Sequence, residues 1–166
     1  MDKKRVVFVS HCLLNQAIRS AENGRYPNVT KELLELFAEH EIGIVQLPCP
    51  RIESNEFSKK LMTKENGDNK KYRIYCQKLS ENMLKQIEMY LKENYGVIGI
   101  LGVEFSNSCA VHQIKNGGKN SPGKGVLLEE LEKSMQRKNF QVPILGINLN
   151  NIYTSIEKLQ SLITFT

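Results

Sequence analysis

The sequence contains no hydrophobic run long enough to form a membrane-spanning helix. Its first residues lead into an apolar segment that is too short for the core of a signal peptide. We therefore expect a cytoplasmic protein, in which thiols are kept reduced. In that compartment the four cysteines of the chain indicate metal binding or catalysis before disulfides.

The sequence also lacks the usual features of a nucleic-acid-binding protein. Its formal net charge is +5, from 23 basic and 18 acidic residues, and such an excess can indicate a nucleic-acid partner. However, the lysines are scattered, and no basic helix or alternation of basic and aromatic residues is present. The charge predicts mild attraction for small anions, so we expect a small-molecule partner, with neither nucleic acid nor membrane bound.

No internal repeat or low-complexity tract divides the 166 residues, and we expect residues 1–166 to form a single domain. Strand-like and helix-like apolar patterns alternate along the chain. Strands are expected at residues 5–10, 42–47, 96–103 and 142–147, and helices at residues 30–40, 72–94, from Ser121–Pro122 onward, and around 152–163. This alternation predicts a three-layer α/β/α fold with a four-stranded parallel sheet in the flavodoxin-like order 2-1-3-4.

Two segments, residues 13–28 and 54–71, follow neither pattern. Both leave the carboxyl ends of predicted strands, where ligands bind in sheets of this kind. They are candidate lids over a site, although ordinary surface loops have the same appearance in a sequence.

Three cysteines follow three predicted strands at the points where the strands end. Cys12 comes after the first strand, Cys49 after the second and Cys109 after the third. In a parallel sheet these ends share one edge, and the first and third strands flank the expected switch point of the topology. The fold would therefore bring together three thiols that are remote in sequence. Cys76 lies on the apolar stripe of a predicted helix, and we expect it to be a small core residue.

Three thiolates favour a soft metal centre. A 4Fe–4S cluster held by three cysteines would leave one iron open to a substrate atom. Zinc is the alternative cofactor, because His112 follows Cys109 by three residues and would complete a closed Cys₃His site in a ligand-binding module without catalysis. A third possibility is a flavodoxin-like ligand-binding or redox protein with incidental cysteines, but residues 11–17 lack the Ser/Thr/Gly-rich loop that a flavin phosphate requires.

The motifs around the cysteines resemble those of the bacterial thiouracil desulfidase family, over most of the chain. The family's first motif, Val-Ser-x-Cys-Leu-Leu-Gly, is matched by residues 9–14, with Asn15 in place of the glycine. Its second motif, Cys-Pro-Glu, corresponds to Cys49 and Pro50 followed by Arg51. Its third, Ser-Pro-Ser-Cys-Gly, corresponds to residues 106–110, which read Ser-Asn-Ser-Cys-Ala.

The resemblance implies a 4Fe–4S enzyme that takes sulfur from a small thiolated, thiouracil-like compound and replaces it with oxygen from water, without net redox change. It also implies that Cys12, Cys49 and Cys109 bind the cluster. Among polar residues, the resemblance assigns a catalytic role to Ser106.

The family's glutamate after Cys-Pro is absent, because Arg51 occupies its place. Glu53, two residues further on, is the expected general base, and Glu104 is the other acid near a predicted strand end. Arg51 instead predicts substrate binding through a carboxylate or phosphate that a guanidinium can hold.

Overall fold

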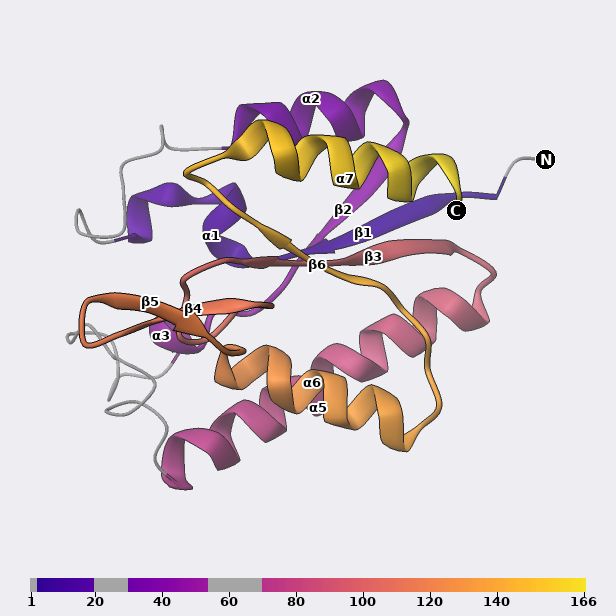
Figure 1. Ribbon diagram of the computed structural model, residues 1–166. Coiled ribbons are helices and arrows are strands. Elements are labelled where there is room, and N and C mark those ends of the chain that lie inside the picture. The colour runs from indigo at the N-terminus through magenta and orange to yellow at the C-terminus, as the bar shows by residue number, and fades with distance from the viewer. Residues whose placement is uncertain (1–2, 20–29, 54–69) are drawn as a thin grey trace.

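The computed structural model describes residues 3–19, 30–53 and 70–166. Its centre is a parallel sheet in the order β2-β1-β3-β6, and helices cover both faces of this sheet (Figure 1). The four strands are β1 (Arg5–Val9), β2 (Ile42–Gln46), β3 (Gly96–Val103) and β6 (Ile144–Ile147). The predicted α/β/α fold with its flavodoxin-like strand order is therefore confirmed.

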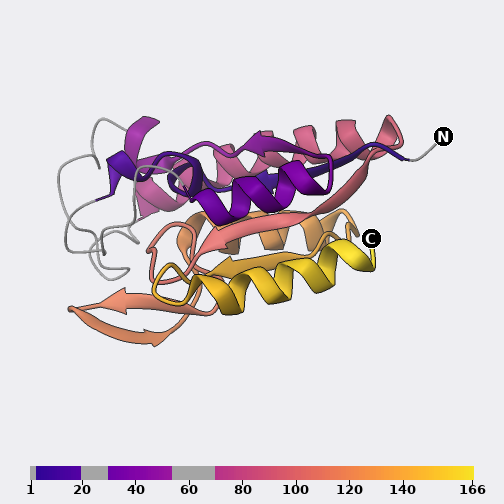
Figure 2. The same ribbon diagram turned by 90° about the horizontal axis from the view of Figure 1, so that it is seen from above.

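The helices form two layers. On one face of the sheet α2 (Lys31–Glu39) lies beside α7 (Ile152–Thr164), and on the other α5 (Lys70–Lys92) packs along α6 (Val126–Arg137), as Figures 1 and 2 show. Because helices cover both faces, every residue of β3 is buried. Alternate side chains of β1 accordingly reach different cores: Phe8 packs with the α5–α6 layer, and Val7 with the α2–α7 layer.

The helix expected from Ser121–Pro122 onward begins later than predicted. Those two residues end β5 (Lys119–Pro122), which pairs antiparallel with β4 (Gln113–Asn116). Gly117 and Gly118 turn this hairpin with φ of +56° and +78°, a conformation that glycine adopts without strain. The prediction was wrong because the hairpin strands are mostly polar and show no apolar alternation.

Two short helices, α1 (His11–Leu14) and η1 (Gln16–Ile18), lie at the start of the first irregular segment, and α3 (Pro50–Glu53) precedes the second segment. The Thr30 hydroxyl, at the N-cap of α2, makes no capping hydrogen bond and instead accepts one from Gln16 Nε2 at 3.0 Å. The rest of the two candidate lids, residues 20–29 and 54–69, lies outside the described residues. Within the described ranges, no helix combines the length and apolar character needed to cross a membrane.

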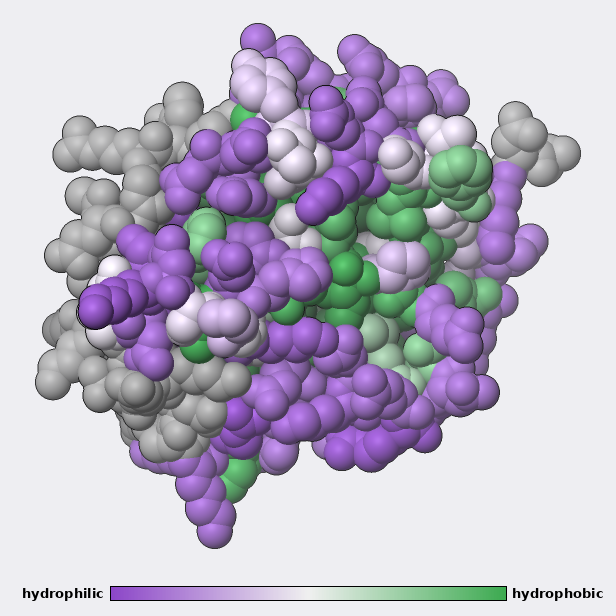
Figure 3. Space-filling view, viewed as in Figure 1, coloured by the Kyte–Doolittle hydropathy of each residue, from purple (hydrophilic) through white to green (hydrophobic). Residues whose placement is uncertain are grey.

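The sheet ends at β6, which has a strand partner on one side in the described sheet. On the face shown in Figure 3, hydrophobic residues gather between α7 and α6, over this edge strand. Ile144 and Leu145 of β6 are accordingly only partly buried. The edge of the sheet at β6 is thus the apolar side of the molecule in this view.

Candidate metal centre

Cys12 is the second residue of α1, which starts directly after β1. The backbone N–H of Ser10 donates to Leu101 O at 3.0 Å, and Ser10 O accepts from Leu13 N at 3.0 Å. Ser10 therefore ties the end of β1 to β3 and begins the turn that carries Cys12. The chain changes from strand to helix within one residue, and this abrupt change places Cys12 at the carboxyl edge of the sheet.

Cys49 lies between β2 and α3. The pairing of β2 with β1 continues to Leu47, whose N–H donates to Val9 O at 2.8 Å. Cys49 O then accepts from Ile52 N at 3.1 Å, and Pro50 occupies the first position of α3, where its lack of an N–H removes no helical bond. Cys49 thus stands at the same edge of the sheet, one strand away from Cys12.

The loop that carries Cys109 is fixed at its backbone. Cys109 O accepts from Val103 N at 2.9 Å, and Cys109 N donates to Ser106 Oγ at 3.1 Å. Carbonyl groups of the loop also accept the first N–H groups of α6, from Val126 N to Asn107 O at 2.9 Å and from Leu127 N to Ser108 O at 3.0 Å. These bonds satisfy donors that a helix start otherwise leaves unpaired, so the loop and α6 hold each other in place.

Two glycines make room for this loop. A Cβ atom at Gly125 would lie 2.2 Å from the backbone carbon of Ser108, and one at Gly102 would lie 2.3 Å from Cys109 O. Any other residue at either position would displace the Cys109 backbone. Gly125, at the start of α6, is therefore part of the support of Cys109.

The three cysteines follow adjacent strand ends at the carboxyl edge of the sheet. Burial raises the pKa of Cys109 well above its usual value, and the thiols of Cys12 and Cys49 raise it further. Burial also raises the pKa of Cys12; the Arg19 guanidinium opposes that rise and Cys49 adds to it. The thiols therefore act on one another electrostatically. That Cys12, Cys49 and Cys109 bind one metal centre stays a prediction.

Buried polar atoms without hydrogen-bond partners in the described structure flank two of these cysteines. They are Ser10 Oγ, His11 Nε2 and Asn107 Oδ1. Gln46 Nε2 lies 2.7 Å from His11 Nδ1, so Nδ1 accepts and Nε2 carries the proton. The Ser10 hydroxyl acts on the Cys109 thiol and lowers its pKa against the other effects, although it forms no hydrogen bond of regular geometry. Two spare donors beside thiols fit a cofactor rich in sulfur acceptors.

A site for a single metal ion is not preformed in the described part of the chain. In the described part of the chain no three His, Cys, Asp or Glu side chains surround one point closely enough to hold an ion. Tetrahedral zinc, with Zn–S bonds of about 2.3 Å, needs its sulfurs about 3.8 Å apart. An iron–sulfur cluster spaces its ligand thiolates more widely, because each binds a different iron.

His112, the fourth ligand of the zinc alternative, is engaged elsewhere. Its Nδ1 lies 2.8 Å from Glu104 Oε1, and Glu104 Oε2 accepts from the backbone N–H groups of His112 at 3.1 Å and Gln113 at 3.0 Å. Glu104 is buried and fixes the start of β4. His112, the alternative zinc ligand, and Glu104, the alternative base, are therefore bonded to each other.

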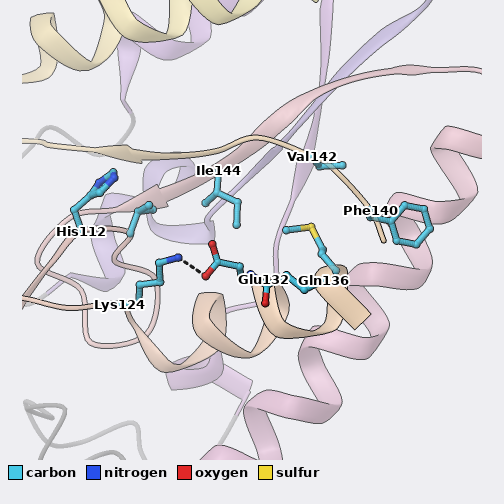
Figure 4. Close-up of a pocket in the computed structure, with 9 residues that line it drawn as sticks. His112, Lys124, Glu132, Gln136, Phe140, Val142 and Ile144 are labelled. Atoms are coloured by element: carbon cyan, nitrogen blue, oxygen red, sulfur yellow. Dashed lines mark hydrogen bonds and ion pairs between the residues drawn. The ribbon is translucent and has the colours of Figure 1, made fainter. Parts of the chain in front are cut away.

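His112 also lines a pocket of about 390 Å³ beside β6 (Figure 4). Lys124 and Glu132 form an ion pair there, over a lining that includes Phe140 and Ile144. None of the three cysteines lines this pocket. It is therefore separate from the candidate metal centre.

The remaining predicted site residues are placed as follows. Ser106 lies in the Cys109 loop, and its Oγ accepts from the N–H groups of Ser108 at 3.3 Å and Cys109 at 3.1 Å. Arg51 lies in α3, two residues after Cys49, and is partly buried. Glu53 is the last residue of α3, and its side chain lies outside the described residues.

Sequence reasoning missed Arg19, which acts on Cys12, and Tyr72, which contacts the loop of Cys109. Arg19 forms a hydrogen bond to Cys12 that helps to lower the pKa of that thiol. The hydroxyl of Tyr72, in the first turn of α5, lies 2.8 Å from Ser108 Oγ. Arg19 lies in an irregular segment, and Tyr72 is far from Cys109 in the sequence, so no motif pointed to either residue. Cys76 is fully buried in the α5–α6 core, as its helical spacing predicted, and lies beside Tyr72.

Comparison with known proteins agrees with the fold. No protein-family model matches the sequence. The structure of a 4Fe–4S-dependent thiouracil desulfidase is similar to this chain with a TM-score of 0.60, over 99% of this chain and 100% of that one. Sequence identity to it is 17%, so this likeness shows the fold alone. The chain therefore has the α/β fold of that desulfidase.

An uncharacterised protein of Methanocaldococcus jannaschii is 36% identical over 166 residues, which cover 96% of this chain and 99% of that protein. This chain belongs to the same family as the M. jannaschii protein. The resemblance to the bacterial desulfidases therefore holds at the level of fold, and membership of the bacterial family is not shown.

Proposed function

We propose that this protein is an iron–sulfur-dependent desulfidase that replaces the sulfur of a small thiolated compound with oxygen. The proposal rests on the positions of Cys12, Cys49 and Cys109, each just past the end of one of three adjacent strands, and on the electrostatic effects between their thiols. The fold, shared with a 4Fe–4S-dependent thiouracil desulfidase, and the spare donors beside the thiols support it.

The three cysteines would hold the cluster as thiolates. A 4Fe–4S cluster with three protein ligands supplies a Lewis-acidic iron that can take the substrate sulfur. Burial raises the pKa of Cys109 and Cys12, which favours the protonated thiols in the metal-free protein, so both would release a proton on loading. The Ser10 hydroxyl favours the charged form of Cys109, and the Arg19 guanidinium favours that of Cys12.

The overall reaction exchanges a C=S group and water for a C=O group and hydrogen sulfide. Ser106 Oγ accepts two backbone hydrogen bonds and keeps its own proton, which it can donate to the substrate. We assign proton removal from the attacking water to Glu53, and recognition of an anionic substrate group to Arg51. The Pro50 ring restrains the turn that carries both residues.

The test is preparation of the protein under anaerobic conditions, followed by assays of iron, acid-labile sulfide and zinc. We expect a brown protein with about four irons per chain. Incubation with 2-thiouracil should then release sulfide and form uracil. Cys109→Ser should lose both the colour and the turnover, whereas Ser161→Ala, a change on the exposed face of α7, should keep both.

Two results would contradict the proposal. A colourless anaerobic protein that contains one zinc per chain, with the zinc lost in His112→Ala, would favour the binding module. A brown protein that releases no sulfide from any of a panel of thiolated pyrimidines, purines and thioamides would refute the desulfidase activity but leave the cluster in place.

A further inference from the structure

Tyr72 contributes the hydroxyl through which α5 contacts the loop of Cys109. The ring is 1% exposed, and its oxygen lies 2.8 Å from Ser108 Oγ in the interior. A buried tyrosine hydroxyl needs a polar partner, because a lost hydrogen bond there is not replaced by water. Ser108 directly precedes Cys109, so this bond ends one residue from the predicted ligand.

The backbone of Ser108 is already fixed on its other sides. Its N–H donates to Ser106 Oγ at 3.3 Å, and its carbonyl accepts from Leu127 N of α6. At Gly125, α6 packs so closely against this backbone that no side chain would fit between them. The Tyr72 hydroxyl completes the arrangement by fixing the side chain of Ser108 from the direction of α5. Rotation of Ser108, which would turn the adjacent Cys109 away from the site, then breaks a buried hydrogen bond.

The surroundings of Tyr72 agree with such a role. Cys76, one helical turn further along α5, lies beside the same hydroxyl, and Cys109 is near enough to act on it electrostatically. Tyr72 and Cys76 therefore form the part of α5 that faces the Cys109 loop. Phenylalanine at position 72 would fill the same volume without the hydroxyl.

We propose that Tyr72 is a positioning residue: its hydroxyl, through Ser108, holds the thiol of Cys109 in the direction that ligation of the iron–sulfur cluster requires. The inference rests on the proposed function, because Cys109 is a ligand only if that function is correct. The Tyr72 hydroxyl bonds to Ser108, which is not one of the predicted ligands. It acts on the ligand loop, and its removal leaves the buried Ser108 hydroxyl without this partner.

The test is a double-mutant cycle of Tyr72→Phe and Ser108→Ala, with Tyr90→Phe as the matched control. Phe keeps the ring in place and removes only the hydroxyl. Tyr90 lies on the same helix, 18 residues along, and packs edge-on against Phe8 and Tyr95. Two rates are measured: alkylation of Cys109 by iodoacetamide in the metal-free protein, followed on the Cys109 peptide by mass spectrometry, and loss of iron to a chelator from the reconstituted protein.

We expect Tyr72→Phe to raise both rates by about five- to tenfold, the effect of one buried hydrogen bond. Ser108→Ala should do the same, and the double variant should be no faster than either single variant, because each removes the same bond. Alkylation of Cys49 in the same molecules, and both rates in Tyr90→Phe, should stay at wild-type values. Circular dichroism and thermal midpoints establish that each variant is folded.

The proposal is overturned if Tyr72→Phe folds and alkylates Cys109 at the wild-type rate, or if the two single effects add. It is also overturned if Cys49 and Cys109 accelerate equally, which would mean general loosening. The two measurements separate this inference from the proposed function. A wild-type protein that takes up no cluster refutes the function, while the alkylation cycle still decides whether Tyr72 positions Cys109.

Discussion

Ser106 has a structural task and a chemical one in the same loop. Its Oγ accepts from the N–H of Cys109, which fixes the turn, and its proton remains available to a substrate. A variant of this residue therefore affects the shape of the loop as well as any reaction. Arg51 lies on α3, where Pro50 occupies the first position and restrains the backbone.

For Glu53 we predict a catalytic effect without a structural one. Glu53→Gln removes the group that takes a proton from water, so kcat should fall by about 10²–10⁴. Iron content and the visible spectrum should stay at wild-type values, because no cysteine changes. The measurement is sulfide release under saturating substrate.

Glu104→Gln serves as the comparison for this prediction. Its carboxylate holds two backbone N–H groups and His112, so its replacement should lower the thermal midpoint more than the turnover per folded molecule. Full activity in Glu53→Gln together with a collapse of activity in folded Glu104→Gln would transfer the role of base to Glu104.

Cys76 should be dispensable for metal binding. It is buried on α5 among apolar residues, and Cys76→Ala removes one sulfur from the core. We expect the free energy of unfolding to fall by about 1 kcal/mol, at the small end of core truncations, with iron per chain unchanged. Urea unfolding and iron assays measure the two effects. Loss of iron on this change would make Cys76 a ligand.

At the scale of elements, the α5–α6 layer carries an ion pair next to the site. Arg73 Nη1 lies 2.6 Å from Glu130 Oε1, and Glu130 is 2% exposed. Burial alone would raise the pKa of Glu130, but the hydrogen bonds from Arg73 and Lys133 outweigh it and lower that pKa. The pair holds together the two helices that support the Cys109 loop, α5 through Tyr72 and α6 through its first turn.

This ion pair predicts a pH dependence of stability. Because the pKa of Glu130 is lower in the folded protein, its contribution is complete above the ordinary glutamate pKa of about 4.3 and is lost as the pH falls through the folded value. Arg73→Met should lower the free energy of unfolding at pH 7 by about 1–3 kcal/mol and flatten its decline below pH 4.5. Denaturant unfolding at several pH values measures both effects.

Lys31→Met is the control for Arg73→Met, since Lys31 forms an exposed pair with Glu35 that should contribute little. Equal losses in the two variants, or an unchanged acid limb in Arg73→Met, would show that Glu130 does not couple the helices.

At the scale of the whole molecule, the parallel sheet gathers groups that the chain keeps far apart. Cys12, Cys49 and Cys109 belong to three separate turns, and adjacent parallel strands bring the carboxyl ends of β2, β1 and β3 to one edge. A cofactor bound to all three would therefore link distant parts of the fold. It would stabilise the folded state and have little affinity for the unfolded chain.

We accordingly predict that cluster loading raises the thermal midpoint. At a cluster availability of about 100 times the dissociation constant the gain is about 2.7 kcal/mol, or about 5–10 °C for a domain of this size. Chelation should reverse it. Anaerobic calorimetry makes the measurement, and Cys49→Ser should keep the metal-free midpoint but show no gain. The prediction fails if loading that is verified by iron assay leaves the midpoint unchanged.

The sequence by itself determined the four strands of the sheet, their order, and the positions of the cysteines after three of them. Those features depend on local patterns: β3 is a continuous apolar run because both of its faces are buried, and Cys76 follows the apolar stripe of α5. The polar hairpin of β4 and β5 escaped prediction because it buries little and therefore has no such pattern.

Only the tertiary structure decided which side chains meet the cysteines. Tyr72 reaches Ser108 across 36 positions of the chain, and Arg19 meets Cys12 from an irregular segment. It also decided that Glu104 and His112 bond to each other, and that Gly125 lies against the Cys109 loop. Contacts of this kind depend on how the helices pack on the sheet, and the spacing of residues along the chain does not encode that packing locally.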